Sequence, residues 1–404
     1  MYLLCVNTHG ETACSVTLKL WVRRGRRALH SARGSPRYAG ATECGSLLRL
    51  NNRGRTPEEP TQMNSNNEKQ QLYKKLTEGK KHTQKWKEYN EAQTKEKIML
   101  YKLLDELLDV VPTRTYTFGR PRKSLRDMIF CCMIKIYSNT SSRRTISDLE
   151  LAKKAGYIND VPHFNTLLNY FDDSGMKMVL NYLITLSALP LKHIEDSFAV
   201  DSTGVGSGRF DRWISQKYGK KKIKNTRGFL KVHACAGTRT NVVTALRVTR
   251  ENFADSPQFS ELVSETGENF LMKEISADKA YSSRDNLELA KSLGAMPYIP
   301  FKKNVTGKWR GSKMWADMYE IFTKNYLEFA KHYHKRSNIE STFAMIKRKF
   351  GDYCRCKSER SQVNEILCKV MAHNLVVLIH EIFELKIDVD FNGIAKNHPA
   401  QKVV

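Results

Sequence analysis

The chain has 404 residues, enough for two or three domains, and a formal net charge of +25 that is spread along its length. This balance indicates a polyanionic partner, usually nucleic acid, although general basicity of the ribosome-associated kind gives a similar count. The chain shows no secretory signal and no uninterrupted run of about 18 apolar residues, and its nine cysteines lack zinc-type spacing, so we expect reduced thiols and neither a membrane span nor a zinc module.

Residues 1–62 differ from the rest in their basic residues, with nine Arg and one Lys against 18 Arg and 39 Lys afterwards. No helical or strand period persists in this segment, so we expect a disordered or non-native leader. The abrupt change at Met63 is also what a start codon assigned too far upstream produces. The alternative is a genuine Arg-rich arm that binds the DNA backbone.

Residues 63–115 read as a basic helical segment, with an apolar stripe that includes Ile98, Tyr101, Leu104 and Leu108. Residues 116–195 read as a helical region that opens with an apolar helix over Leu125–Tyr137.

Two short helices, Arg143–Ala155 and Pro162–Phe171, are predicted on either side of Gly156. They outline a helix-turn-helix, which is a common DNA-binding arrangement. An ordinary helical hairpin is the alternative.

Residues 196–360 contain a different pattern, in which strands come first as a hairpin and then alternate with helices. Strands are predicted at Ser197–Asp201, Phe229–Ala236, Asn241–Val248, Glu274–Asp278 and Met296–Pro300. A helix is predicted from Ser256, with Asp255 as its N-cap. This order indicates an α/β fold with a mixed sheet flanked by helices.

The stretch from Tyr333 to Phe350 is free of Gly and Pro and is closed by Gly351, which predicts one helix. At 100° per residue, Tyr333, Arg336 and Lys347 fall in one row with Glu340, beside a buried apolar stripe. Such a row suits a carboxylate that holds a metal ion while its neighbours hold phosphates. A solvated charged face is the alternative.

Residues 361–404 are predicted to form a C-terminal helix over Gln362–Leu385 and a tail. Asn374 interrupts the apolar stripe of this helix, and we interpret it as a satisfied core amide.

Two acids upstream of Glu340, Asp201 and Asp278, each come at the predicted end of a strand. Either one alone could be a turn former. Strand ends would place both acids at one edge of the sheet, and the later helix could bring Glu340 across to them.

The spacing Tyr-x2-Arg-x3-Glu-x6-Lys, formed here by Tyr333, Arg336, Glu340 and Lys347, resembles the signature of the DDE (RNase H-like) transposases of insertion sequences. The resemblance implies an RNase H-like sheet, preceded by a helical DNA-binding region. It also implies that Asp201, Asp278 and Glu340 are the catalytic metal ligands for Mg²⁺, with Mn²⁺ as a substitute.

The same resemblance implies cleavage at the terminal inverted repeats of the element and joining of the 3′-OH to target DNA. Double-stranded DNA and a second copy of the chain are the expected partners, in a prokaryotic cytoplasm close to the nucleoid. A catalytically silent DNA-binding descendant and a structure-selective nuclease are the rival readings.

The expected DNA contacts fall into three groups. Tyr333, Arg336 and Lys347 come from the signature, while Lys220, Lys221 and Lys222 lie in a basic loop. Lys231 and His233 share one face of a predicted strand, where a solvated face is an equally good reading.

Overall fold

The computed structural model describes residues 85–112, 122–207 and 228–398, all within one compact unit that extends from Glu59 to Val404. The leader 1–62 and the lysines at 220–222 lie outside these ranges, so the predictions made for them stay untested.

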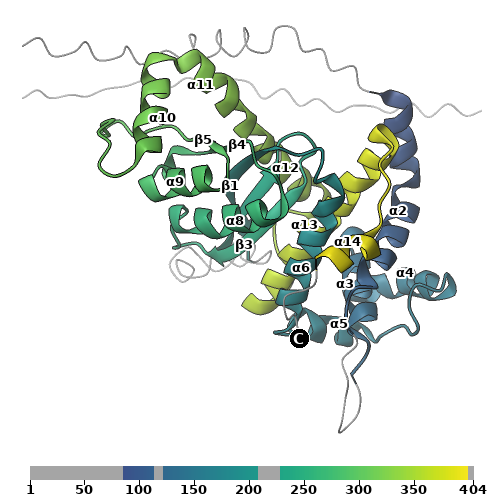
Figure 1. Ribbon diagram of the computed structural model, residues 1–404. Coiled ribbons are helices and arrows are strands. Elements are labelled where there is room, and N and C mark those ends of the chain that lie inside the picture. Colours follow the sequence, from purple (N-terminus) through teal and green to yellow (C-terminus); the bar gives the residue numbers. More distant parts are fainter. Residues whose placement is uncertain (1–84, 113–121, 208–227, 399–404) are drawn as a thin grey trace, which may run out of the picture. The chain divides into compact units, whose positions relative to one another are not determined.

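In the described part of the chain, five α-helices come before the sheet (Figure 1). They are α2 (Trp86–Leu108), α3 (Leu125–Tyr137), α4 (Ser142–Lys154), α5 (Phe164–Phe171) and α6 (Met176–Ala188). The predicted bounds of α3 are confirmed, whereas α6 was not anticipated. On α2, Tyr101, Leu104 and Leu108 are buried as the stripe requires, but Ile98 is exposed.

The long helix α13 (Glu359–Leu385) is the centre of this helical region, because α2, α3, α5 and α6 all contact it. It is long and apolar enough to cross a membrane, yet 72% of its most apolar window is buried inside the protein. We therefore assign α13 as a core helix.

Asn374 confirms the core position of α13. Its side chain is fully buried and bonds to both the N–H and the C=O of Val243, and to the Ser187 hydroxyl. Since every one of these partners is also buried, the amide satisfies groups that would otherwise lack a partner.

The helices α4 and α5 contact each other, as a helix-turn-helix requires. Residues 155–163 separate them, a longer connection than the turn of about 3–4 residues typical of that motif. The helix-turn-helix stays a prediction.

The sheet has five strands, in the order β3-β2-β1-β4-β5. These are β1 (Ser197–Gly206), β2 (Phe229–Gly237), β3 (Val243–Arg250), β4 (Glu274–Ala277) and β5 (Met296–Tyr298). The first three are antiparallel neighbours, while β4 pairs parallel to β1 and β5 parallel to β4. The predicted RNase H-like mixed sheet is confirmed.

The strand β1 is longer than predicted, because it continues through Asp201 to Gly206. The cause is its antiparallel partner β2, which pairs with β1 as far as Gly206, whereas β4 pairs only up to Val200. Asp201 therefore lies within the strand, at the point where the parallel ladder stops.

The helices α8 (Ser256–Asn269) and α12 (Ser337–Phe350) pack on the sheet. A bond between Thr244 and Thr266 ties α8 to β3, and Phe343 of α12 lines a small cavity with Val232 and Ala234 of β2. Because side chains alternate along a strand, His233 and Val232 point to opposite faces.

The segment between β5 and α12 begins as a loop, becomes helical from Lys313 and is held by aromatic contacts. It contains α10 (Lys313–Lys324), α11 (Tyr326–Tyr333) and the single turn η4 (His334–Arg336), none of them separated in the prediction. The rings of Phe301 and Trp315 lie 4.8 Å apart, and those of Phe322 and Phe329 lie 5.0 Å apart. The single helix predicted from Tyr333 to Phe350 is thus wrong at its start.

The remaining short elements connect these layers. They are η1 (Leu189–Leu191), η3 (Lys279–Tyr281), α9 (Arg284–Ser292) and α14 (Phe391–Asn397).

Candidate active site

Asp201 and Asp278 stand side by side in sequence register. The last pair of the parallel ladder joins Val200 of β1 to Ala277 of β4. Asp201 directly follows Val200 in the chain, and Asp278 directly follows Ala277. Two buried parallel strands therefore deliver two carboxylates to one edge of the pairing, as the sequence predicted.

The Asp201 carboxylate uses its two oxygens differently. Oδ1 accepts a hydrogen bond from the Ser202 backbone N–H at 2.8 Å, and Oδ2 accepts one from the Arg336 guanidinium at 2.7 Å. Burial raises the pKa of Asp201, and the neighbouring Asp278 and Glu340 carboxylates raise it further, while Ser202 and Arg336 oppose them. The three acids therefore form one electrostatic group.

Arg336 joins the first acid to the third. Its second terminal nitrogen donates to Glu340 Oε1 at 2.6 Å, on the next turn of the chain. The Arg336 side chain is 20% exposed and that of Glu340 is 57% exposed, so the pair opens towards solvent. A large anionic substrate can reach both groups.

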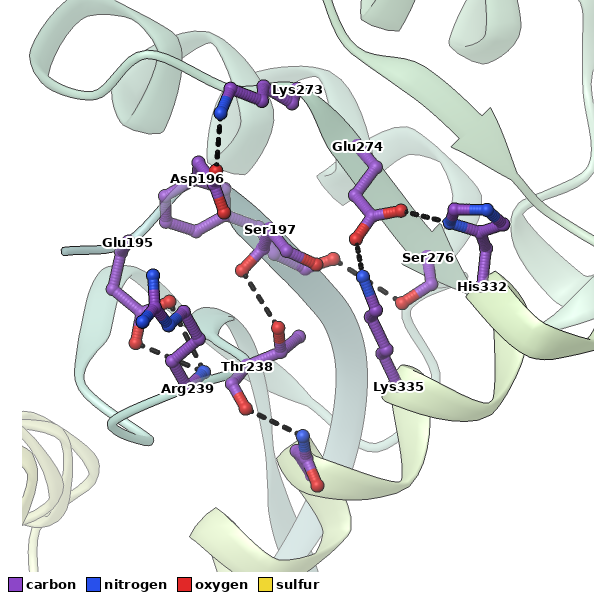
Figure 2. A network of polar contacts seen from close by, with 12 residues as sticks. Glu195, Asp196, Ser197, Thr238, Arg239, Lys273, Glu274, Ser276, His332 and Lys335 are labelled. Carbon is purple, nitrogen blue, oxygen red and sulfur yellow. Dashed lines mark hydrogen bonds and ion pairs between the residues drawn. The ribbon is translucent and has the colours of Figure 1, made fainter. Parts of the chain in front are cut away.

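Arg336 is held in position by its neighbours in the chain, because residues of η4 and of the start of α12 bond to the sheet (Figure 2). Glu274 of β4 accepts hydrogen bonds from Lys335 and from His332. Burial opposes ionisation of Glu274, but these bonds and one from Ser197 lower its pKa overall. On the next turn, the Asn338 amide donates to the Thr238 carbonyl at 2.6 Å. These contacts place the signature helix over β1.

Lys347 and Tyr333 complete the predicted row. Lys347 Nζ donates to Thr203 Oγ1 at 2.6 Å, two residues along β1 from Asp201, and burial lowers its pKa. Tyr333 lies 5.9 Å from the Arg336 guanidinium, which approaches the face of the ring. The structure therefore brings all four signature residues close to the middle of β1, where Asp201 lies.

The carboxylates match the hard oxygen donors that Mg²⁺ prefers, and Asp201 and Glu340 already share one cationic partner. Within the described ranges, however, no group of three or more His, Cys, Asp or Glu side chains lies close enough to hold a metal ion as it stands. The carboxylate donors fit a divalent cation, and the Arg336 guanidinium lies between two of them, Asp201 and Glu340.

Lys231 and His233 were predicted as DNA contacts, but both side chains lie largely inside the protein. The His233 side chain is fully buried and bonds to Thr249 Oγ1 at 2.9 Å, so DNA cannot reach it. Lys231 Nζ lies 2.6 Å from Asp255 Oδ1 and is 19% exposed. The burial contradicts His233 as a DNA contact, and we do not propose either residue as one.

Asp255 occupies the predicted N-cap position of α8, but its side chain makes no capping bond. Its carboxylate faces Lys231 and His233 instead. Sequence reasoning missed this cluster because its members come from separate segments. Their polar residue types in an otherwise apolar strand were the available signal.

Residues 193–375 match the family model of the transposase DDE domain. The matched segment begins before β1 and ends within α13, so it includes the sheet, the three acids and α12. Searches of curated proteins and of solved structures found no match to the chain.

Proposed function

Because residues 193–375 belong to the transposase DDE domain family, we propose that this protein is an insertion-sequence transposase. It binds the terminal inverted repeats of its element, cleaves the DNA at the element ends and joins the freed 3′-OH to target DNA. One observation carries the proposal: Arg336 bonds at once to Asp201 and Glu340, while the third acid, Asp278, stands beside Asp201 in register.

Asp201, Asp278 and Glu340 would hold the divalent ions, Mg²⁺ or Mn²⁺. When bound, two such ions supply activation of the attacking oxygen and stabilisation of the leaving oxygen in phosphoryl transfer. The partly buried Asp201 would then exchange its guanidinium partner for the metal. This exchange frees Arg336 for the substrate.

Arg336 and Lys347 would bind phosphate oxygens beside the cleaved bond. A guanidinium presents a planar fork of donors, which matches a phosphate well, and both side chains already lie along β1. The Tyr333 ring packs against Phe329, which fixes the position of the ring. The Tyr333 hydroxyl could then orient the DNA.

Two element ends must be handled together, so we propose that two copies of the chain act on the DNA in the cytoplasm of a prokaryotic cell. The two rivals predict different behaviour: a silent descendant binds ends without cutting, and a structure-selective nuclease cuts without preference for ends.

The experiment uses the full chain and a DNA fragment that carries the sequences flanking its gene. With Mg²⁺, cleavage at the fragment's inverted repeats and joining to a second DNA support the proposal. A fragment with scrambled ends and the Glu340→Gln variant are the controls. Binding without cleavage favours the silent protein, and equal cleavage of the scrambled fragment favours the nuclease.

A further inference from the structure

A charged cluster lies within the fold on the opposite face of the sheet from Arg336. We call Lys231, His233 and Asp255 the Asp255 cluster. Asp255 Oδ1 lies 2.6 Å from Lys231 Nζ and 3.3 Å from His233 Nδ1. His233 pairs across the strands with Ser202, and Asp201 next to Ser202 points the other way. The cluster therefore stands behind the first acid.

Packing alone does not account for this cluster. A buried ion pair loses hydration that its mutual attraction only partly returns, so it is weak evidence for stability. Its hydrogen bonding is also incomplete: in the part of the chain that the structure describes, His233 Nδ1 and Asp255 Oδ1 have ion-pair distances but no partner in hydrogen-bond geometry.

The cluster is connected to the second acid through the turn η3. Tyr281, at the end of η3, is buried against Phe259 of α8 with a ring separation of 5.9 Å. Burial raises the pKa of Tyr281, and the charges of Asp255 and then Asp201 raise it further.

A second link runs through the Asn286 amide. It donates to the Tyr281 carbonyl at 2.9 Å and to the Ser256 hydroxyl at 3.2 Å, which ties η3 to the first residue of α8. Ser256 directly follows Asp255. The position of Asp255 thus fixes where α8 begins, and α8 fixes the turn that Asp278 opens.

We propose that Lys231, His233 and Asp255 are positioning residues that hold the Asp278 turn at its working distance from Asp201. The cluster anchors the start of α8 to β2, and α8 holds η3 through Tyr281 and Asn286. This role rests on the proposed function, since the working distance is the one at which both acids bind metal.

The test variants are Asp255→Asn, which removes the charge at constant shape, and Asn286→Leu, which removes the amide bonds to Tyr281 and Ser256 at nearly the same size. The matched control is Thr244→Val. Thr244 is also buried and also bonds to α8, through Thr266 at 2.9 Å, but it has no bond to η3. All three changes weaken contacts of α8 or η3 without opening a large cavity.

Two quantities are measured on the metal-free full chain. The first is hydrogen exchange of the η3 amides, reported by the Tyr281 N–H that bonds to the Asp278 carbonyl at 2.9 Å. The second is the affinity for Mn²⁺ alone, measured by calorimetry. Asp255→Asn should speed exchange at η3 and weaken Mn²⁺ binding about 10-fold or more, as loss of a supporting partner does in metal sites.

Asn286→Leu should change both quantities in the same direction, and Thr244→Val should change neither. Unchanged exchange and affinity in Asp255→Asn and Asn286→Leu would overturn the inference. Equal changes in Thr244→Val would also overturn it, since general loosening of α8 would then explain them. The wild-type chain could bind no Mn²⁺ while exchange at η3 still responded to Asp255→Asn. This result would contradict the proposed metal site but would support the connection between the Asp255 cluster and η3.

Discussion

The Arg336 guanidinium donates to the Asp201 carboxylate at 2.7 Å, although the two residues are 135 positions apart in the chain. This contact joins the first acid of the site to the sequence signature, which extends from the end of α11 through η4 to α12.

Replacing an acid with its amide should abolish cleavage and leave DNA binding largely intact. Asp201→Asn, Asp278→Asn and Glu340→Gln each remove a negative metal ligand without removing volume, so the fold should survive. End cleavage and end binding should be measured in parallel. A variant that still cleaves at nearly the wild-type rate would show that its acid is not a ligand.

Arg336→Ala should lower end cleavage by roughly 10² or more, because it removes a fixed donor beside developing charge. Lys347→Ala should act in the same direction. Both effects should appear in single-turnover cleavage of pre-bound DNA. Weaker binding with normal cleavage of the bound DNA would instead mean that these cations only attract the substrate.

Phe343→Ala tests the buried stripe of α12, which lies beside the signature row. Phe343 is 7% exposed and packs α12 onto the sheet, so truncation should lower the free energy of unfolding by roughly 3–5 kcal/mol. Denaturant unfolding measures this change. Lys347→Ala should lose far less stability, and the reverse order would mean that the helix is rotated.

His373 should make the protein acid-sensitive. Burial lowers its pKa from 6.5 to about 4, so the unfolded chain binds a proton between these values that the folded chain rejects. The stability contribution is therefore complete above about pH 6.5 and is lost as the pH falls to about 4, by about 3 kcal/mol. The difference between wild type and His373→Gln, measured by denaturant unfolding across this range, isolates the effect.

Glu381 should work in the opposite direction over a similar range. Burial raises its pKa from 4.5 to about 7, so its contribution is complete below about pH 4.5 and is lost as the pH rises through about 7. Glu381→Gln should therefore gain stability relative to wild type as the pH rises. If both variants shifted the pH profile in the same direction, one of the two assignments would be wrong.

Much of the fold could be read from the sequence, because the relevant signals are local. Apolar runs and turn residues located the strands, and a strand that ends in an acid identified Asp278. The helical period placed Glu340 of α12 in a row with Lys347 and with Arg336, which lies in the preceding turn η4. These features follow from backbone geometry within one element, so a single segment is enough to determine them.

The tertiary structure decided what depends on partners from distant segments. Pairing with β2 carried β1 beyond Asp201, which the run Ser197–Asp201 by itself could not reveal. Asp255 had the sequence context of a helix cap, yet it faces Lys231 and buried His233 because β2 lies within ion-pair distance of it. Burial and charge pairing are properties of the assembled fold, and the fold alone made a supposed DNA contact part of the interior.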